Sequence, residues 1–282
     1  MQLRAWLDKG EAALRAGPHP EKARRDAELL LLFAAGLSRS AFLAHPNDEL
    51  ELAAATHFEV LLERRLEGEP IQHITGACEF YGLPFRVTGD VLIPRPETEH
   101  LVECALELAP RFAEPRIVDI GTGSGAIAVV LAHSLPNARI TATDVSEAAL
   151  VLARENAARS GVGERIRFLQ GDLLAPVAAE RVDIVVSNSP YVPTADRDSL
   201  SVEVRDFEPG LALFAGEDGL DIYRRLIPAA FAVLVSGGFI ALEIGCGQRD
   251  AVDLLLADAG FGAIEFRLDL QGIHRVAIAR RP

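Results

Sequence analysis

The 282-residue sequence predicts an α/β fold in which helices cover both faces of a mostly parallel sheet, preceded by a small all-α bundle and a β-hairpin linker. Three observations predict it. Apolar residues recur at helical spacing near the N-terminus, an aromatic and β-branched stretch follows, and short apolar strands then alternate with helices. We therefore expect a helical domain over 1–72, a β-hairpin linker over 73–90 and a larger domain over 91–282.

The N-terminal helices are predicted from AELLLLFAAGL and ELAAATHFEVLLERRLEG, with breaks at GPHP and HPND. Nine basic and twelve acidic residues over 1–72 argue against a nucleic-acid-binding arm and leave a protein-docking or packing module. Next, EFYGLPFRVTGDVLIP carries aromatic and β-branched residues around Gly82 and Pro84, which predicts the hairpin.

Beyond Arg116 the pattern of the larger domain is typical of βαβ units. The strands RIVDI, RITAT, IRFLQ and DIVVS alternate with the helices AIAVVLAHS and SEAALVLARENAARS. GAIEFRLDL and HRVAIAR instead flank QGI, which leaves no room for a crossover helix. We expect these last two strands to pair antiparallel.

Composition excludes several classes of protein. With 41 acidic and 28 basic residues the formal charge is −13, which opposes direct binding to a nucleic-acid backbone. The three cysteines form no CxxC pair, so neither a disulfide framework nor a zinc site is expected, and a reducing, cytoplasmic compartment fits. Arg4, Asp8 and Lys9 interrupt any signal peptide, and the longest uncharged run, over 226–242, is too short and too rich in Pro and Gly to span a membrane. No metal site is expected.

A glycine-rich loop gives the first functional signal. In DIGTGSGAI, Gly121, Gly123 and Gly125 lie between a strand and a helix, where the backbone can turn sharply and approach a ligand. Asp144 ends the next strand, where a carboxylate can accept from both hydroxyls of a ribose, and Asp172 follows the third strand, where it could accept from an adenine amino group. The loop also satisfies the dinucleotide fingerprint, so NAD and S-adenosylmethionine both remain open. Asp119, two residues before the loop, suits the cationic methionine end of S-adenosylmethionine better than a pyrophosphate.

The stretch NSPY follows the strand DIVVS and predicts a site for a planar NH₂ group. The side-chain oxygen of Asn188 and the carbonyl of Ser189 are two acceptors, Pro190 fixes φ, and Tyr191 can stack on a flat ligand. The alternative is a turn with a side-chain hydrogen bond after a strand.

NSPY resembles the N/D-P-P-Y/F signature of methyltransferases that act on planar nitrogens. EGEPIQHITGACEFYGLPFRV, VLIPRPETEHLVE, IVDIGTGSGAIAVVLA and FEPGLALFAGEDGLDIYRRLI resemble the bacterial peptide chain release factor N5-glutamine methyltransferases, the PrmC/HemK family. DAELLLLFAAGLSRSAFLAHP resembles the helical domain of that family. The resemblance covers nearly the whole chain, and LIPRPETE is its most specific part.

The resemblance implies a Rossmann-like class I methyltransferase with a seven-stranded sheet whose last strand is antiparallel. It implies methyl transfer from S-adenosyl-L-methionine, leaving S-adenosyl-L-homocysteine, to the side-chain amide N5 of the glutamine in the GGQ motif of release factors. The helical domain would dock the factor, and the protein would be a monomer. The donor site would comprise Gly121, Thr122, Gly123, Ser124, Gly125, Asp144, Leu173 and Asn188, and the glutamine site Asn188, Ser189, Pro190 and Tyr191.

Two residues depart from the family pattern. Ser189 stands where proline is usual, which retains the peptide carbonyl but removes one fixed φ and adds an N–H. Leu173 stands where an aromatic residue can occur, so apolar contact would replace stacking on adenine. We expect weakened or unchanged activity, not another reaction.

Some roles and readings stay open. Arg95 and Glu97 fit a helix start or a frame for the site, Glu208 is expected to be a solvated loop charge, and His73 and His274 are expected to be structural. The competing functions are an N6-adenine methyltransferase, a non-catalytic adaptor that has lost turnover through Ser189, and an NAD enzyme.

Overall fold

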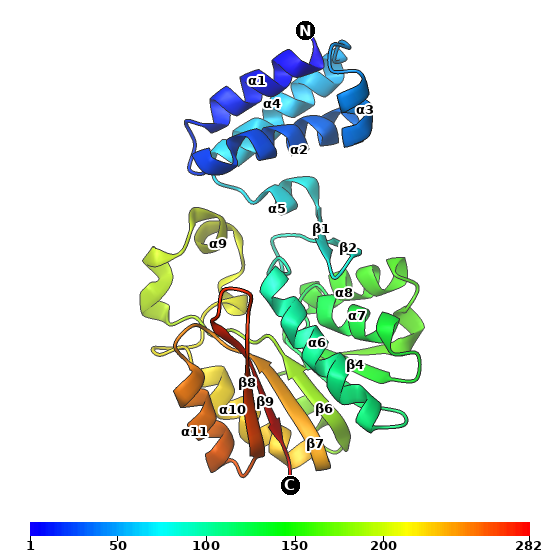
Figure 1. Ribbon diagram of the computed structural model, residues 1–282, viewed down its shortest axis with the longest axis vertical. Coiled ribbons are helices and arrows are strands. Elements are labelled where there is room, and N and C mark those ends of the chain that lie inside the picture. The colour runs from blue at the N-terminus through cyan, green and yellow to red at the C-terminus, as the bar shows by residue number, and fades with distance from the viewer. The chain divides into compact units, whose positions relative to one another are not determined.

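The computed structural model describes residues 1–282, which form two compact units (Figure 1). One unit comprises Met1–Ala77 and Leu200–Phe207, and the other comprises Cys78–Ser199 and Glu208–Pro282. Residues 200–207 are predicted to belong to the larger domain, whereas the structure joins this segment to the N-terminal helices.

The helical unit is built around three packed helices, α1, α2 and α4. Its helices are α1 (Leu3–Leu14), α2 (Ala23–Ala35), α3 (Arg39–Ala44), α4 (Leu52–Leu66), α5 (Ile71–Thr75) and α9 (Val202–Phe207). Leu7, Leu30 and Phe58 are fully buried at its centre. Gly10 lets α1 approach α4, because a Cβ there would lie 2.6 Å from the ring of Phe58.

Helix α9 joins this unit through a buried ion network and a tight apolar contact. The Arg65 guanidinium is 2% exposed, donates from Nε to Asp26 Oδ2 at 2.7 Å and lies 2.6 Å from Glu203 Oε1. A Cβ on Gly68 would lie 2.5 Å from Val202, so only glycine allows this approach. Two segments more than 130 residues apart in the chain are therefore fastened into one unit.

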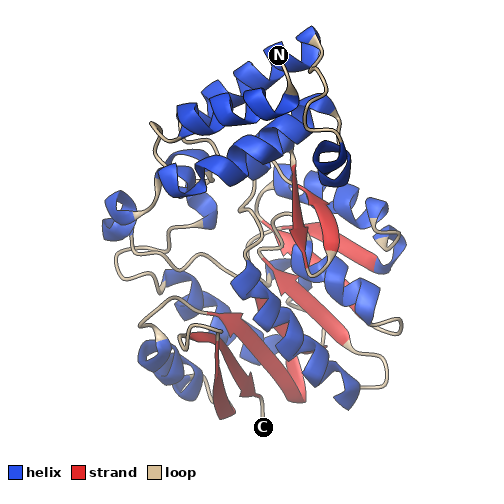
Figure 2. Cartoon of the chain, turned by 45° about the horizontal axis from the view of Figure 1, so that its top comes forward, coloured by secondary structure: helices blue, strands red, loops and turns tan.

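The larger unit contains a seven-stranded sheet with the order β5-β4-β3-β6-β7-β9-β8 (Figures 1 and 2). Its strands are β3 (Arg116–Ile120), β4 (Arg139–Asp144), β5 (Ile166–Gln170), β6 (Val182–Ser187), β7 (Leu234–Glu243), β8 (Gly262–Leu268) and β9 (His274–Arg280). The pairs from β5 to β7 are parallel, and β9 runs antiparallel to both β7 and β8. The predicted mostly parallel sheet with an antiparallel last strand is confirmed.

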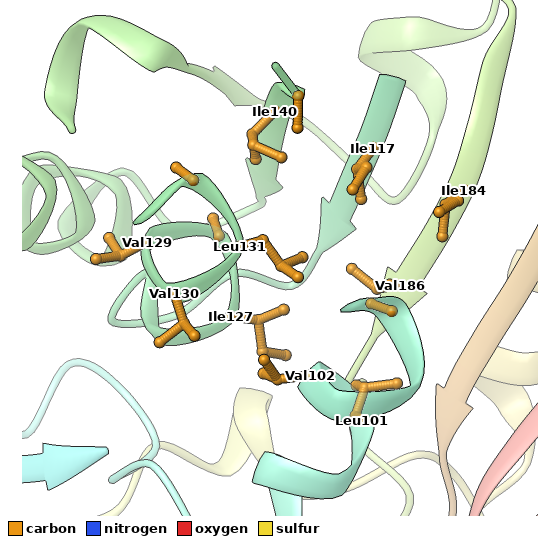
Figure 3. Packing of buried hydrophobic residues seen from close by; sticks show 14 of the residues in the cluster. Leu101, Val102, Ile117, Ile127, Val129, Val130, Leu131, Ile140, Ile184 and Val186 are labelled. Carbon is orange, nitrogen blue, oxygen red and sulfur yellow. The ribbon is translucent and has the colours of Figure 1, made fainter. Parts of the chain in front are cut away.

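Helices cover both faces of the sheet, as predicted. They are α6 (Glu99–Leu108), α7 (Ala126–Ser134), α8 (Glu147–Arg159), α10 (Asp221–Val233) and α11 (Arg249–Asp258). Side chains alternate along each strand, so Ile117 and Ile184 pack with α6 and α7 (Figure 3), whereas Val118 and Val185 pack with α10 and α11. Both faces are apolar because both are buried.

The predicted hairpin forms from β1 (Ala77–Phe80) and β2 (Leu83–Arg86). Tyr81 and Gly82 both have positive φ, at 52° and 72°, as a two-residue type I′ turn requires. Glu99 Oε1 accepts from the Tyr81 amide at 2.8 Å, which holds the turn against the start of α6.

None of the helices has the length and apolar character needed to cross a bilayer.

Candidate active site

A cavity of about 430 Å³ lies beyond the carboxyl ends of the central strands of the larger unit. This is the edge at which ligands bind in open α/β sheets, and the volume lies within the usual range for small-molecule sites. Of the thirteen residues predicted for the site, ten line the cavity: Gly121, Thr122, Gly123, Ser124, Asp144, Asp172, Leu173, Asn188, Ser189 and Pro190. Gly125, Asp119 and Tyr191 lie outside its lining.

The glycine loop turns from β3 into α7 and places bare backbone at the cavity. Gly121, Gly123 and Gly125 have φ of 69°, 54° and 82°, the left-handed region that glycine favours. No protein atom comes nearer than 4.0 Å to a Cβ built on Gly121 or Gly123, so the space there is open. Gly125 has a packing role instead, because a Cβ there would lie 3.0 Å from Ala153 of α8.

Asp144, the last residue of β4, holds the glycine loop and the start of α8 together. Its Oδ2 accepts from the Gly123 amide and its Oδ1 from the Ser146 amide, both at 2.9 Å. Ser146 in turn caps α8 by accepting from the Ala149 amide at 3.2 Å. The carboxylate is thus fixed at the cavity wall, where its remaining lone pairs can accept from ligand hydroxyls.

Asp119, in β3 behind the loop, is fully buried, and only its Oδ2 has a hydrogen-bond donor, Thr122 Oγ1 at 2.6 Å. Burial raises the pKa of Asp119 from 3.8 to about 7. Oδ1 has no hydrogen-bond partner in the protein. A buried carboxylate in this state is stabilised by a nearby cation.

Asp172 and Leu173 line the cavity from the turn that follows β5. The Asp172 carboxylate forms an ion pair with Arg225, which also lines the cavity, and its remaining lone pairs can still accept from a ligand. Leu173 has a φ of 50°, and its carbonyl accepts from Thr143 Oγ1 at 3.0 Å.

The stretch NSPY begins one residue after β6 and turns into the cavity. The Ser189 side chain is buried and hydrogen-bonds Ser187 Oγ, which itself donates to the Ile120 carbonyl at 2.8 Å. Serine therefore gains a local anchor in place of the proline ring. Tyr191 turns away from the cavity lining, and its hydroxyl donates to Glu243 Oε1 at 3.3 Å.

Two residues beside the cavity, Thr98 and Glu243, are not among the residues predicted for the site. Glu243, the last residue of β7, is 1% exposed, and its Oε2 accepts from Thr98 Oγ1 at 2.7 Å. Thr98 lines the cavity and accepts from Asn188 Nδ2 at 2.9 Å. Burial raises the pKa of Glu243 to about 7. The signal that could have found Glu243 is an acid at the carboxyl end of an apolar strand, as for Asp144.

The expectation that Glu208 is a solvated loop charge is wrong. Its side chain is 1% exposed, forms an ion pair with Arg95, and accepts from the Ile93 amide at 3.3 Å. Burying a carboxylate is tolerated here because a guanidinium and an amide compensate the charge. This contact fastens LIPRPETE to the segment that follows NSPY.

Two family models match the chain. The PrmC N-terminal domain matches residues 5–76, and the methyltransferase small domain matches residues 98–204. Solved structures share the fold: the hMettl16 catalytic domain has a TM-score of 0.59 at 15% identity, covering 89% of this chain and 90% of that chain. A methyltransferase from Pyrococcus furiosus has a TM-score of 0.53 at 19% identity, covering 72% and 90%. The class I methyltransferase fold is thereby shown.

Curated relatives match over the full length. The release factor glutamine methyltransferase of Moorella thermoacetica is 46% identical over 282 residues, which is 100% of this chain and 99% of the relative. That of Deinococcus radiodurans is 45% identical over 283 residues, with the same coverage. With both the helical and the methyltransferase segments matched at this identity, the chain belongs to the release factor glutamine methyltransferase family.

Proposed function

We propose that the protein transfers a methyl group from S-adenosyl-L-methionine to the side-chain amide N5 of the glutamine in the GGQ motif of peptide chain release factors. The observation that carries the proposal is one cavity that combines the open glycine loop and Asp144 with the amide of Asn188. The glycine loop and Asp144 suit a nucleoside, and the Asn188 amide suits a planar amide.

The residues fit the methyl donor. Bare backbone at Gly121 and Gly123 leaves room for it, and Asp144 offers acceptors to its ribose. The buried Asp119 carboxylate, whose Oδ1 has no hydrogen-bond partner, favours its cationic end. When bound, S-adenosylmethionine supplies an electrophilic methyl group on a sulfonium. The C–S bond to the methyl group breaks as the new C–N bond forms, so the by-products are S-adenosyl-L-homocysteine and the proton that the amide nitrogen loses.

The chain's own residues bind and orient the glutamine amide. Asn188 Oδ1 and the carbonyl of Ser189 accept from its two N–H groups, which holds the nitrogen in place and increases its electron density. Pro190 limits the backbone freedom of this turn. A neutral amide is a weak nucleophile, so positioning and hydrogen bonding supply the larger part of the catalysis.

The helical unit offers a surface for the release factor. Leu29 and Phe33 of α2 and Val60 of α4 are 40%, 45% and 49% exposed, and the rings of Phe33 and His57 are 6.0 Å apart. Apolar side chains grouped on neighbouring helices are typical of protein-binding surfaces. We propose that this patch docks the factor, that the chain acts as a monomer in the cytoplasm, and that it binds no nucleic acid directly.

The test is to incubate the protein with S-adenosylmethionine and an unmodified bacterial release factor and to locate the added methyl by peptide mass spectrometry. We expect one methyl on the GGQ glutamine, none on a factor with Asn in place of that Gln, and none with the Asn188→Ala variant. Asp250→Asn, at an exposed position outside the cavity, is the matched control and should act as wild type.

Each other result identifies a competing function. Donor binding without transfer to any factor would favour the non-catalytic adaptor. Methylation of a nucleic acid in place of the factor would favour the N6-adenine reading, and binding of NAD without binding of the methyl donor would favour the NAD reading.

A further inference from the structure

The sheet register brings Asn188 and Glu243 close together. Ser187 of β6 pairs with Leu242 of β7, so the next residues of these parallel strands are Asn188 and Glu243. Thr98 reaches the same point from the 3₁₀ turn Pro96–Thr98, directly before α6. Three segments thus meet in one chain of hydrogen bonds, from Asn188 Nδ2 to Thr98 Oγ1 at 2.9 Å and from Thr98 Oγ1 to Glu243 Oε2 at 2.7 Å.

This chain of hydrogen bonds has a direction. When Glu243 is ionised its carboxylate only accepts, and a threonine hydroxyl has a single hydrogen, which Thr98 donates to Glu243. Thr98 Oγ1 must then accept from the other side, so it faces the NH₂ group of Asn188. The amide oxygen, Oδ1, is left as the acceptor for a ligand in the cavity.

We propose that Thr98 and Glu243 are positioning residues, which fix the Asn188 amide with its oxygen toward the cavity and so select a ligand that donates N–H. The proposal deepens the proposed function and rests on it for the identity of the ligand as an amide. Glu243 also accepts from the Tyr191 hydroxyl through Oε1, so one carboxylate orients both ends of NSPY.

The direction of these hydrogen bonds depends on the carboxylate of Glu243. In Glu243→Gln the new NH₂ group can donate to Thr98, whose hydroxyl can then donate to Asn188 Oδ1. The Asn188 amide would rotate and present NH₂ to the cavity, where it repels an N–H donor. Thr98→Val removes the hydroxyl that connects Glu243 to Asn188, which we call the relay, and Thr98→Ser keeps this hydroxyl.

Methyl transfer to the release factor in a single turnover tests the consequence for catalysis. We expect Thr98→Val and Glu243→Gln to lower the rate about ten- to a hundredfold, as loss of a hydrogen bond to a charged group does, with unchanged affinity for S-adenosylmethionine. Thr98→Ser should retain most of the rate. The matched controls are Thr141→Val in β4 and Glu164→Gln at an exposed turn, which lie outside the cavity lining and should act as wild type.

A second readout does not need turnover. The side-chain amide of Asn188, assigned by its absence in Asn188→Ala, is followed by NMR between about pH 5.5 and 8.5. Its resonance should move with a midpoint near 7, the pKa of Glu243, and this movement should vanish in Glu243→Gln and Thr98→Val. It should persist in Thr98→Ser and Glu164→Gln.

Four other groups act electrostatically on Glu243 or hydrogen-bond to it. They are Tyr191 after β6, with its pKa raised by burial, Arg275 of β9, Glu97 beside Thr98, and Tyr223 of α10, whose hydroxyl donates to the Glu243 carbonyl at 2.7 Å. Asp119 also has a pKa of about 7, but it remains in Glu243→Gln. The variant therefore separates the two carboxylates.

The methyl-transfer rate and the NMR titration distinguish failure of the positioning role from failure of the proposed function. If the Asn188 resonance of the wild-type protein does not change with pH, or still changes in Thr98→Val, the proposed positioning role of Thr98 and Glu243 is overturned, whatever the substrate is. Wild-type rates in both Thr98→Val and Glu243→Gln would overturn it as well. If the wild-type protein methylates no release factor, the proposed function fails, and the NMR readout alone decides the relay.

Discussion

The buried carboxylate of Asp119 predicts that stability falls as pH rises. Its pKa is about 7 in the folded protein and 3.8 in the unfolded chain. A carboxyl with a raised pKa favours the folded state fully below the unfolded value, and this contribution is lost as pH rises through 7. At 1.36 kcal/mol per unit of pKa the full loss is about 4 kcal/mol. About 2 kcal/mol of it falls between roughly pH 5.5 and 8.5.

Asp119→Asn removes this dependence because an amide does not titrate. Urea unfolding at about pH 5.5 and 8.5 measures the free energy of unfolding of both proteins. We expect the variant to gain about 2 kcal/mol relative to wild type between the lower and the higher pH. Contributions that do not depend on pH, such as an Asn NH₂ group without an acceptor, cancel in this difference, and so does Glu243. Parallel stability profiles for the two proteins would refute the reasoning.

Three further predictions follow from the contacts described. Arg65→Met leaves the buried Asp26 unpaired, so urea unfolding should show a free energy of unfolding lower by about 3–5 kcal/mol. Arg24→Met, at an exposed ion pair, should lower it by less than about 1 kcal/mol. Equal losses in the two variants would contradict the role of burial. Asp144→Asn should weaken binding of S-adenosylmethionine about tenfold or more in calorimetric titration, and an unchanged Kd would exclude Asp144 from the donor site. Ser189→Pro should turn over the release factor at the wild-type rate or faster, and a loss of activity would show that the serine is required.

Much of the fold could be predicted from local pattern. The strands Arg116–Ile120, Ile166–Gln170 and His274–Arg280 coincide with the predicted segments, because each is an apolar run bounded by turn residues. The hairpin around Tyr81 and Gly82 is likewise set by residues adjacent in the chain. The glycine loop and the strand-end position of Asp144 also depend only on neighbouring residues, and both line the cavity.

What could not be predicted depends on partners far apart in the chain. Arg95 and Glu208 are 113 residues apart, and Thr98 and Glu243 are 145 residues apart. A single sequence gives no sign of such pairs, so an acid in a loop is taken as solvated by default. The position of Asp172 after a strand can be predicted locally, but its ion pair with Arg225 depends on α10, which lies far along the chain.

The helical unit is assembled from two stretches of the gene, and this limits how it can be exchanged in evolution. Recombination that replaced only the first 77 residues would combine a foreign bundle with the original Glu203. Glu203 would then lose its ion pairs with Lys22 and Arg65. The eight residues at 200–207 are therefore expected to be inherited together with the N-terminal bundle, and substitutions at Arg65 and Glu203 should appear jointly across descendants.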